Sequence, residues 1–236
     1  MTNGSMSTAT SPELRPLYED AQLLVLDKPP GLLVHPSGLD AHETDTLLAR
    51  AQAQFGGWLT PAHRLDKGTS GVLLLARDAA TASQLGAWFR DGQVRKGYLG
   101  LVRGWPAGEQ GRIDHPLARD PELPSQGQPQ LEAQTDWRCL RRFEWPVPTH
   151  PQFHATRAAL LALEPLQGRR HQIRRHCKHI AHPLIGDATH GKGPLNRALA
   201  AYLGRSRLWL HAQWLELPDG RRFEAAPGPE WAGLPA

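Results

Sequence analysis

The sequence lacks the usual features of secreted, membrane-spanning and disulfide-stabilised proteins. Its two cysteines, Cys139 and Cys177, are far apart and form no Cys-x-x-Cys pair, so we expect two free thiols in a reducing compartment. Residues 1–16 have neither a basic nor an apolar stretch, and we do not expect a signal peptide. No segment approaches the roughly 18 apolar residues of a membrane helix. These absences predict a cytoplasmic protein that does not bind membranes.

The sequence also has no internal repeat and no low-complexity tract. Its 236 residues fit one large domain, which we place at residues 17–236, after a disordered lead-in at residues 1–16. The 23 glycines and 21 prolines favour many turns over a helical bundle. A net charge of +4 and a pI near 9.4 are compatible with a nucleic-acid partner, although charge alone does not establish one.

Short apolar runs alternate with a few helical segments along the chain. Strands are predicted over residues 23–26, 71–76, 98–102, 155–163 and 208–217, and helices over residues 46–55 and 78–90. Residues 168–180 are predicted to be a loop that enters a helix. Asp45 and Asp78 are the expected N-caps of the first two helices. Residues 104–135 show little periodicity and are predicted to be a loop or insertion. This order of elements predicts an α+β fold with a mixed, largely antiparallel sheet and flanking helices.

Three polar clusters stand out from this background. They are HRLD at residues 63–66, RKGY at residues 95–98, and GRRHQIRRH at residues 168–176, which is followed by HPLIGD at residues 182–187. The first cluster precedes the buried strand predicted at residues 71–76, and polar loops at the end of a rigid strand are common places for a functional site. We therefore expect a site near residue 66.

These clusters resemble the sequence blocks of RluA-type pseudouridine synthases. Residues 63–71 resemble the HRLD-x-x-TSG signature, residues 168–174 the GR-x-HQIR block, residues 183–187 the P-[IL]-x-GD block, and residues 27–31 the KP-x-G block. Four blocks in the same order are a specific signal, and the resemblance extends across residues 17–217. Lys67 stands where the family usually has Arg, and Arg170 where it often has Thr or Lys.

The resemblance implies a pseudouridine synthase fold with a central RNA-binding cleft. The implied reaction breaks the C1′–N1 bond of a uridine and forms a C1′–C5 bond without redox change, so no cofactor and no metal are expected. Residues 34–37, residues 102–105 and the His190-Gly191 pair resemble the branch that modifies uridine 65 in the T-stem of tRNA. A synthase acting on ribosomal RNA is the alternative. We expect a monomer with RNA, most simply tRNA, as its partner.

The resemblance also assigns roles to individual residues. It implies that Asp66 is the catalytic carboxylate, acting either as a nucleophile at the sugar or as a base toward its C2′ proton. Arg174 is implied to pair with Asp66 and keep it ionised, and Tyr98 to stack on the target uracil. The target nucleotide must be flipped out of its stack, and Arg64 is implied to occupy the space it leaves. The residues expected to contact RNA are His63, Arg64, Arg95, Lys96, Arg169, Arg170, His171, Arg175 and Lys178.

Other interpretations of these residues remain open. Asp66 could cap a local turn, and Tyr98 could be an ordinary core aromatic. The basic residues could belong to an RNA-binding module without activity. His176, His179 and His182 invite a metal-dependent hydrolase, although their spacing matches no known zinc pattern.

Overall fold

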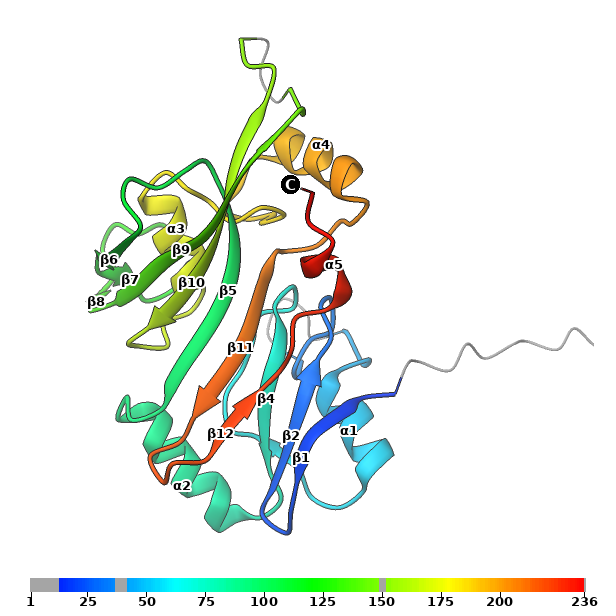
Figure 1. The fold of residues 1–236 in the computed structure, drawn as a ribbon. Helices are drawn as coiled ribbons and strands as arrows, with labels where there is room; N and C mark the ends of the chain where they lie inside the picture. Colours follow the sequence, from blue (N-terminus) through cyan, green and yellow to red (C-terminus); the bar gives the residue numbers. More distant parts are fainter. Residues whose placement is uncertain (1–12, 37–41, 149–151, 236) are drawn as a thin grey trace, which may run out of the picture.

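A computed structural model of the chain describes residues 13–36, 42–148 and 152–235. It confirms the predicted α+β class, with helices packed on both faces of one large mixed sheet (Figure 1). In spatial order the main strands are β1 (Arg15–Glu19), β2 (Leu23–Lys28), β4 (Ser70–Ala76), β11 (Leu210–Glu216), β5 (Arg95–Arg103), β10 (Thr156–Pro165), β9 (Gln134–Trp145) and β6 (Gln110–Asp114). All neighbours are antiparallel except β4 and β11, which are parallel.

The smaller elements complete the architecture. β3 (Thr60–Pro61) pairs with β4, β12 (Arg222–Glu224) pairs with β11, and β7 (Leu117–Ala118) pairs with β8 (Gln130–Leu131) in a separate small sheet. The helices are α1 (Leu47–Phe55), α2 (Ala79–Arg90), α3 (Gln172–His179), α4 (Gly193–Leu203) and α5 (Pro229–Ala232). None of the helices in the described ranges is long and apolar enough to cross a membrane.

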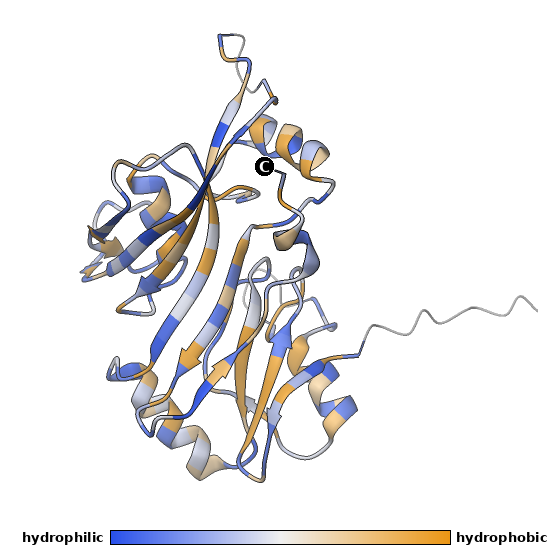
Figure 2. Ribbon diagram, in the orientation of Figure 1, coloured by the Kyte–Doolittle hydropathy of each residue, from blue (hydrophilic) through white to orange (hydrophobic). Residues whose placement is uncertain are grey.

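Strand β4 is the rigid centre of one half of the molecule. All seven of its residues are buried, as its continuous apolar run predicts. Leu73 and Leu75 pack in a cluster with α1 on one face, while Val72 and Leu74 pack in a cluster with α2 on the other. Figure 2 shows β2 and β4 as mostly hydrophobic. The loop that precedes β4 is therefore attached to a strand fixed on both faces.

The other half of the sheet is formed by β5, β10 and β9. Its strands present one apolar face to α3 and the opposite face to α4. Ile173 and Cys177 are the α3 residues that enter the core, as the helical periodicity predicts. Cys177 is free and buried, and Cys139 is free and half-buried. This packing fixes α3 against the sheet at a position facing the β4 loop.

Three local predictions are wrong. Thr46, not Asp45, caps α1, because its hydroxyl accepts the Ala49 N–H while Asp45 forms an ion pair with Arg50. The segment at residues 104–135 contains β6, β7, β8 and the start of β9; these strands are short or lie at a polar edge, so they lack an apolar repeat. The lead-in that was expected to be disordered up to residue 16 is ordered at its end. Leu14 is buried and hydrogen-bonded to Gln54, and β1 begins at Arg15. Residues 1–12 of that lead-in lie outside the described residues.

Candidate active site

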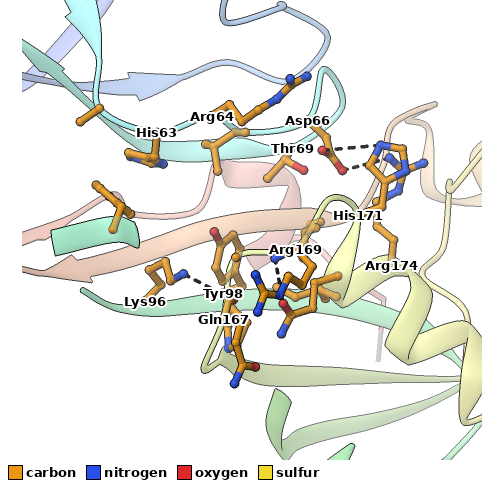
Figure 3. Close-up of a pocket in the computed structure, with 18 residues that line it drawn as sticks. His63, Arg64, Asp66, Thr69, Lys96, Tyr98, Gln167, Arg169, His171 and Arg174 are labelled. Carbon is orange, nitrogen blue, oxygen red and sulfur yellow. Dashed lines mark hydrogen bonds and ion pairs between the residues drawn. The ribbon is translucent and has the colours of Figure 1, made fainter. Parts of the chain in front are cut away.

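A cavity of about 300 Å³ lies where the loop before β4 faces the segment that enters α3 (Figure 3). Most of the residues singled out in the sequence line it, although they come from three separate segments. These residues are His63, Arg64, Asp66, Lys96, Tyr98, Arg169, His171 and Arg174. The structure therefore brings the three polar clusters together in one place.

Asp66 forms an ion pair with Arg174 at the edge of this cavity. The Asp66 Oδ2 accepts a hydrogen bond of 2.9 Å from the Arg174 Nη1, and Figure 3 shows the two side chains pointing toward each other. The Asp66 side chain is 21% exposed, whereas that of Arg174 is 9% exposed. A carboxylate that is paired but still accessible can act on a substrate in the cavity.

The backbone of the Asp66 loop is held from behind by the segment at residues 27–31. The Lys67 carbonyl accepts hydrogen bonds from the Gly31 N–H at 2.8 Å and from the Lys28 Nζ at 3.1 Å. Lys28 is completely buried, and this burial lowers its pKa to about 7, a shift that the nearby negative charge of Asp66 opposes. The KPPG turn thus has a physical role that its sequence alone does not reveal.

Asp187 anchors the other side of the Arg174 guanidinium. Its two oxygens accept hydrogen bonds from the Arg174 Nε at 2.8 Å and Nη2 at 2.9 Å, and its side chain is fully buried. Burial alone would raise the pKa of the Asp187 carboxyl, but the hydrogen bonds and charge of Arg174 outweigh burial and hold the pKa below its usual range. The backbone N–H groups of Thr189 and His190 also donate to Asp187. The sequence contains the GD block, but adjacent residues do not reveal this role of Asp187.

Tyr98 lies on β5, between the two halves of the sheet. Its ring packs against the apolar clusters on both sides, and its hydroxyl makes no hydrogen bond within the described ranges. Burial, followed by the negative charge of Asp66, raises the pKa of the phenol well above its ordinary value. Tyr98 therefore presents a neutral aromatic ring and hydroxyl to the cavity.

His171 contacts Asp66 from the entry to α3. Its Nε2 is 3.8 Å from the Asp66 Oδ1, and its Nδ1 is 3.4 Å from the His190 Nε2. The residue has a left-handed backbone with φ of 54°, which is unusual for a residue other than glycine. Burial lowers the pKa of His171, while the charge of Asp66 opposes this change. The structure thus places His171 beside the carboxylate.

His63 and Lys96 form the opposite wall of the cavity. The His63 Nε2 accepts the Leu74 N–H at 3.2 Å, and its ring stacks on Phe89. Burial, together with the charge of Lys96, lowers the pKa of His63 to about 3, so this ring is neutral at pH 7. Lys96 donates a long hydrogen bond of 3.5 Å to the Gln167 carbonyl, and burial lowers its pKa to about 8.

The other predicted RNA contacts differ in their surroundings. Arg95 pairs with Glu216, and Arg170 pairs with Asp120 and Glu122; neither lines the cavity. Arg64 is exposed, and its side chain forms no hydrogen bond or ion pair with the described part of the chain. Arg169 and Arg175 form no ion pair with the described part of the chain, but the side chain of each donates a hydrogen bond to a backbone carbonyl.

The three histidines near Cys177 have separate structural partners. His176 bonds to the Thr135 hydroxyl and the His115 carbonyl, His182 bonds to the Arg103 carbonyl, and the His179 ring stacks on His115. Within the described ranges, no three His, Cys, Asp or Glu side chains are placed to hold a metal ion together. The geometry gives no support to a metal-dependent hydrolase.

Comparisons with known proteins identify the family of this chain. The family model of RNA pseudouridylate synthases matches residues 22–179. A tRNA pseudouridine synthase C of Pasteurella multocida (strain Pm70) is 43% identical over 210 residues, which cover 84% of this chain and 83% of the relative. A tRNA pseudouridine synthase C of Haemophilus ducreyi (strain 35000HP) is 41% identical over 216 residues, which cover 90% of this chain and 88% of the relative.

Two solved human structures share the fold. The human RNA pseudouridylate synthase domain containing 1 protein superposes with a TM-score of 0.71 and 28% identity, covering 97% of this chain and 87% of the human one. The human RNA pseudouridylate synthase domain containing 4 protein superposes with a TM-score of 0.68 and 26% identity. This match covers 92% of this chain and 90% of the human one. The predicted fold and family are thereby confirmed: this chain belongs to the RluA-type RNA pseudouridylate synthase family, and it is an isomerase.

Proposed function

We propose that this enzyme converts a uridine of tRNA, uridine 65 in the T-stem, to pseudouridine, with Asp66 as its catalytic residue. The observation that carries the proposal is the Asp66–Arg174 ion pair at the edge of a cavity also lined by Tyr98. The cavity volume of about 300 Å³ is at the lower end of the range for small-molecule sites, which suits a single flipped nucleoside.

Asp66 is the carboxylate that can reach the sugar of a nucleotide in the cavity. Asp187 also contacts Arg174, but its side chain is fully buried and cannot touch substrate. Among the described residues that line the cavity, Asp66 is the one carboxylate. A single carboxylate suits an isomerisation that keeps the detached base, whereas ordinary glycoside hydrolysis uses two. Asp66 acts on the sugar as a nucleophile or as a base toward the C2′ proton, and Arg174 keeps it ionised and oriented.

The remaining cavity residues would hold the base and the RNA strand. In this proposal Tyr98 stacks on the uracil while the C1′–N1 bond breaks and the C1′–C5 bond forms. The C5 proton is then lost and N1 gains one, so the product is an isomer. Arg64 is exposed at the mouth of the cavity and can enter the stack that the uridine leaves. Lys96 and Arg169 supply positive charge near the flipped nucleotide.

The choice of tRNA rests on the relatives named tRNA pseudouridine synthase C, which are 38–43% identical to this chain. To test it, the purified protein is incubated separately with a tRNA transcript and with ribosomal RNA, and pseudouridine is mapped in each. We expect one modified uridine in tRNA, at position 65, and none when that position is cytidine. Modification of ribosomal RNA instead of tRNA would contradict the proposed substrate, and RNA binding without modification would contradict the proposed activity.

A further inference from the structure

A second cavity lies directly beside the active-site cavity. Its volume is about 550 Å³, and it is formed between α3 and the segment at residues 115–130. The side chains of His171 and His190 separate the two cavities, since His171 lines the first and His190 the second. Their ring centroids are 5.5 Å apart, so the wall between the cavities is about one pair of rings thick.

The second cavity has an excess of positive charge. Arg175 and Lys178 project into it from α3 and carry this charge. His115 and His190 also line it, but burial lowers the pKa of each ring. Among the described residues that line it, Asp120 is the one carboxylate, and it already pairs with Arg170. Lys178 is exposed, and its side chain makes no hydrogen bond or ion pair within the described ranges. The net charge therefore favours an anionic ligand.

The same cavity offers a surface on which a base can stack. The rings of His115 and His179 are stacked, with centroids 3.7 Å apart and an interplanar angle of 13°. Leu123, on the same lining, is 60% exposed although it is apolar. Proteins that bind single-stranded RNA combine such rings with cations that follow the backbone.

The cavity is held in place from several directions. Arg175 donates to the Ala118 carbonyl at 2.9 Å, and a His176 ring nitrogen is 3.0 Å from the His115 carbonyl. Arg170 adds ion pairs to Asp120 and Glu122. Figure 1 shows β7 and β8 of this segment beside α3. The segment at residues 115–130 is thus fixed to the helix that carries Arg174, and both cavities keep a constant separation.

We propose that the second cavity binds the nucleotide next to the target uridine. Its phosphate lies against Lys178 and Arg175, and its base lies on the His115–His179 stack. This inference rests on the proposed function, because it takes the ligand to be the substrate strand that leaves the active site past His171 and His190. Enzymes that flip a base commonly hold the flanking nucleotides as well.

Replacement of Lys178 by alanine tests the phosphate contact. Lys178 is exposed, so Lys178→Ala should fold normally, which thermal unfolding can verify. We expect KM for tRNA to rise about tenfold with kcat unchanged, because a contact made equally in the ground and transition states affects binding alone. The slope of log affinity against log salt should fall by about one. Lys178→Arg should restore KM, and Arg205→Ala, a matched change of an exposed cation away from the cavity, should leave it unchanged.

Substrates with one neutral linkage identify the partner of Lys178. RNA affinity is measured for tRNA carrying a methylphosphonate on the 5′ or the 3′ side of the target uridine, with wild type and with Lys178→Ala. At one of these positions the effects of the neutral linkage and of Lys178→Ala on RNA affinity should be non-additive. There the neutral linkage should weaken RNA binding by wild type about tenfold, and it should weaken binding by Lys178→Ala little further. Strict additivity at both positions, or an unchanged KM for Lys178→Ala, would overturn the inference. The target uridine is located beforehand by pseudouridine mapping, so a wrong substrate is seen in the mapping, whereas a wrong assignment of the second cavity is seen in the affinities.

Discussion

The two sides of the active-site cleft hold their charged groups in different ways. On the β4 side, Asp66 is on a loop fixed mainly through its backbone, and its side chain is 21% exposed with one strong ion-pair contact. On the α3 side, Arg174 is 9% exposed and Asp187 fully buried, and the two share a bidentate pair. The difference separates a group that can react from the pair that positions it. Changes on the two sides should therefore have different consequences.

Asp66→Asn should have the largest effect on activity and almost none on stability. The amide keeps the shape of the side chain but can be neither an effective nucleophile nor a base, so turnover should fall by about 10⁴-fold or more. Arg174 remains neutralised by Asp187, so the free energy of unfolding should change by less than about 1 kcal/mol. Single-turnover assays and denaturant unfolding measure the two quantities. A stable variant with substantial activity would remove Asp66 from the chemistry.

Arg174→Ala should damage both stability and activity. It leaves the buried carboxylate of Asp187 without its counter-ion, which typically costs about 3–5 kcal/mol. Arg174→Lys is the matched control, since it keeps the charge but loses the bidentate geometry and should be intermediate. Equal stability of wild type and Arg174→Ala in urea unfolding would show that the ion-pair network contributes nothing.

Asp187→Asn should have a smaller effect of the same kind. The amide oxygen can still accept one hydrogen bond, but the carboxylate charge is lost, and we expect a loss of about 1–3 kcal/mol. Activity should fall less than in Asp66→Asn, because the reacting carboxylate and its guanidinium remain. If kcat instead fell as far as in Asp66→Asn, Asp187 would have a direct part in the reaction.

The pH dependence of stability gives the smallest expected effect. Burial lowers the pKa of His190 to about 4 and that of His63 to about 3, whereas histidine in the unfolded chain titrates near 6.5. The unfolded state therefore binds more protons in acid, so stability should be full above about pH 6.5 and should fall as the pH decreases toward 4. His63→Gln, which keeps a hydrogen-bond acceptor but does not titrate, should show a weaker dependence in thermal unfolding at pH 7 and pH 5.

The sequence predicted the β4 side of the cleft better than the α3 side. The apolar run of β4, the Asp78 cap of α2 and the site near Asp66 can be recognised from adjacent residues. The Arg174–Asp66 pair came from the family resemblance and is confirmed as a contact. The bidentate pairing of Asp187 with Arg174 could not be predicted, because it depends on how the segment that follows α3 folds back onto that helix.

The outer strands were missed for a different reason. β9 exposes Arg138, Arg141 and Arg142, so its sequence lacks the alternating apolar pattern of a half-buried strand. Figure 2 colours much of β9 as hydrophilic. Arg170, which is expected to contact RNA, also pairs with Asp120 and Glu122, about 50 residues earlier in the chain. Charge in a sequence indicates a possible partner but does not distinguish RNA from a distant segment of the same protein.

The most direct test of the central claim is pseudouridine mapping in total RNA from cells that lack this gene and then receive it back. We predict that one tRNA uridine loses its modification in the deletion strain, that the wild-type gene restores it, and that a gene encoding Asp66→Asn at the same protein level does not. Restoration by the Asp66→Asn gene would contradict the account, because pseudouridine would then form without the carboxylate that Arg174 holds at the cavity.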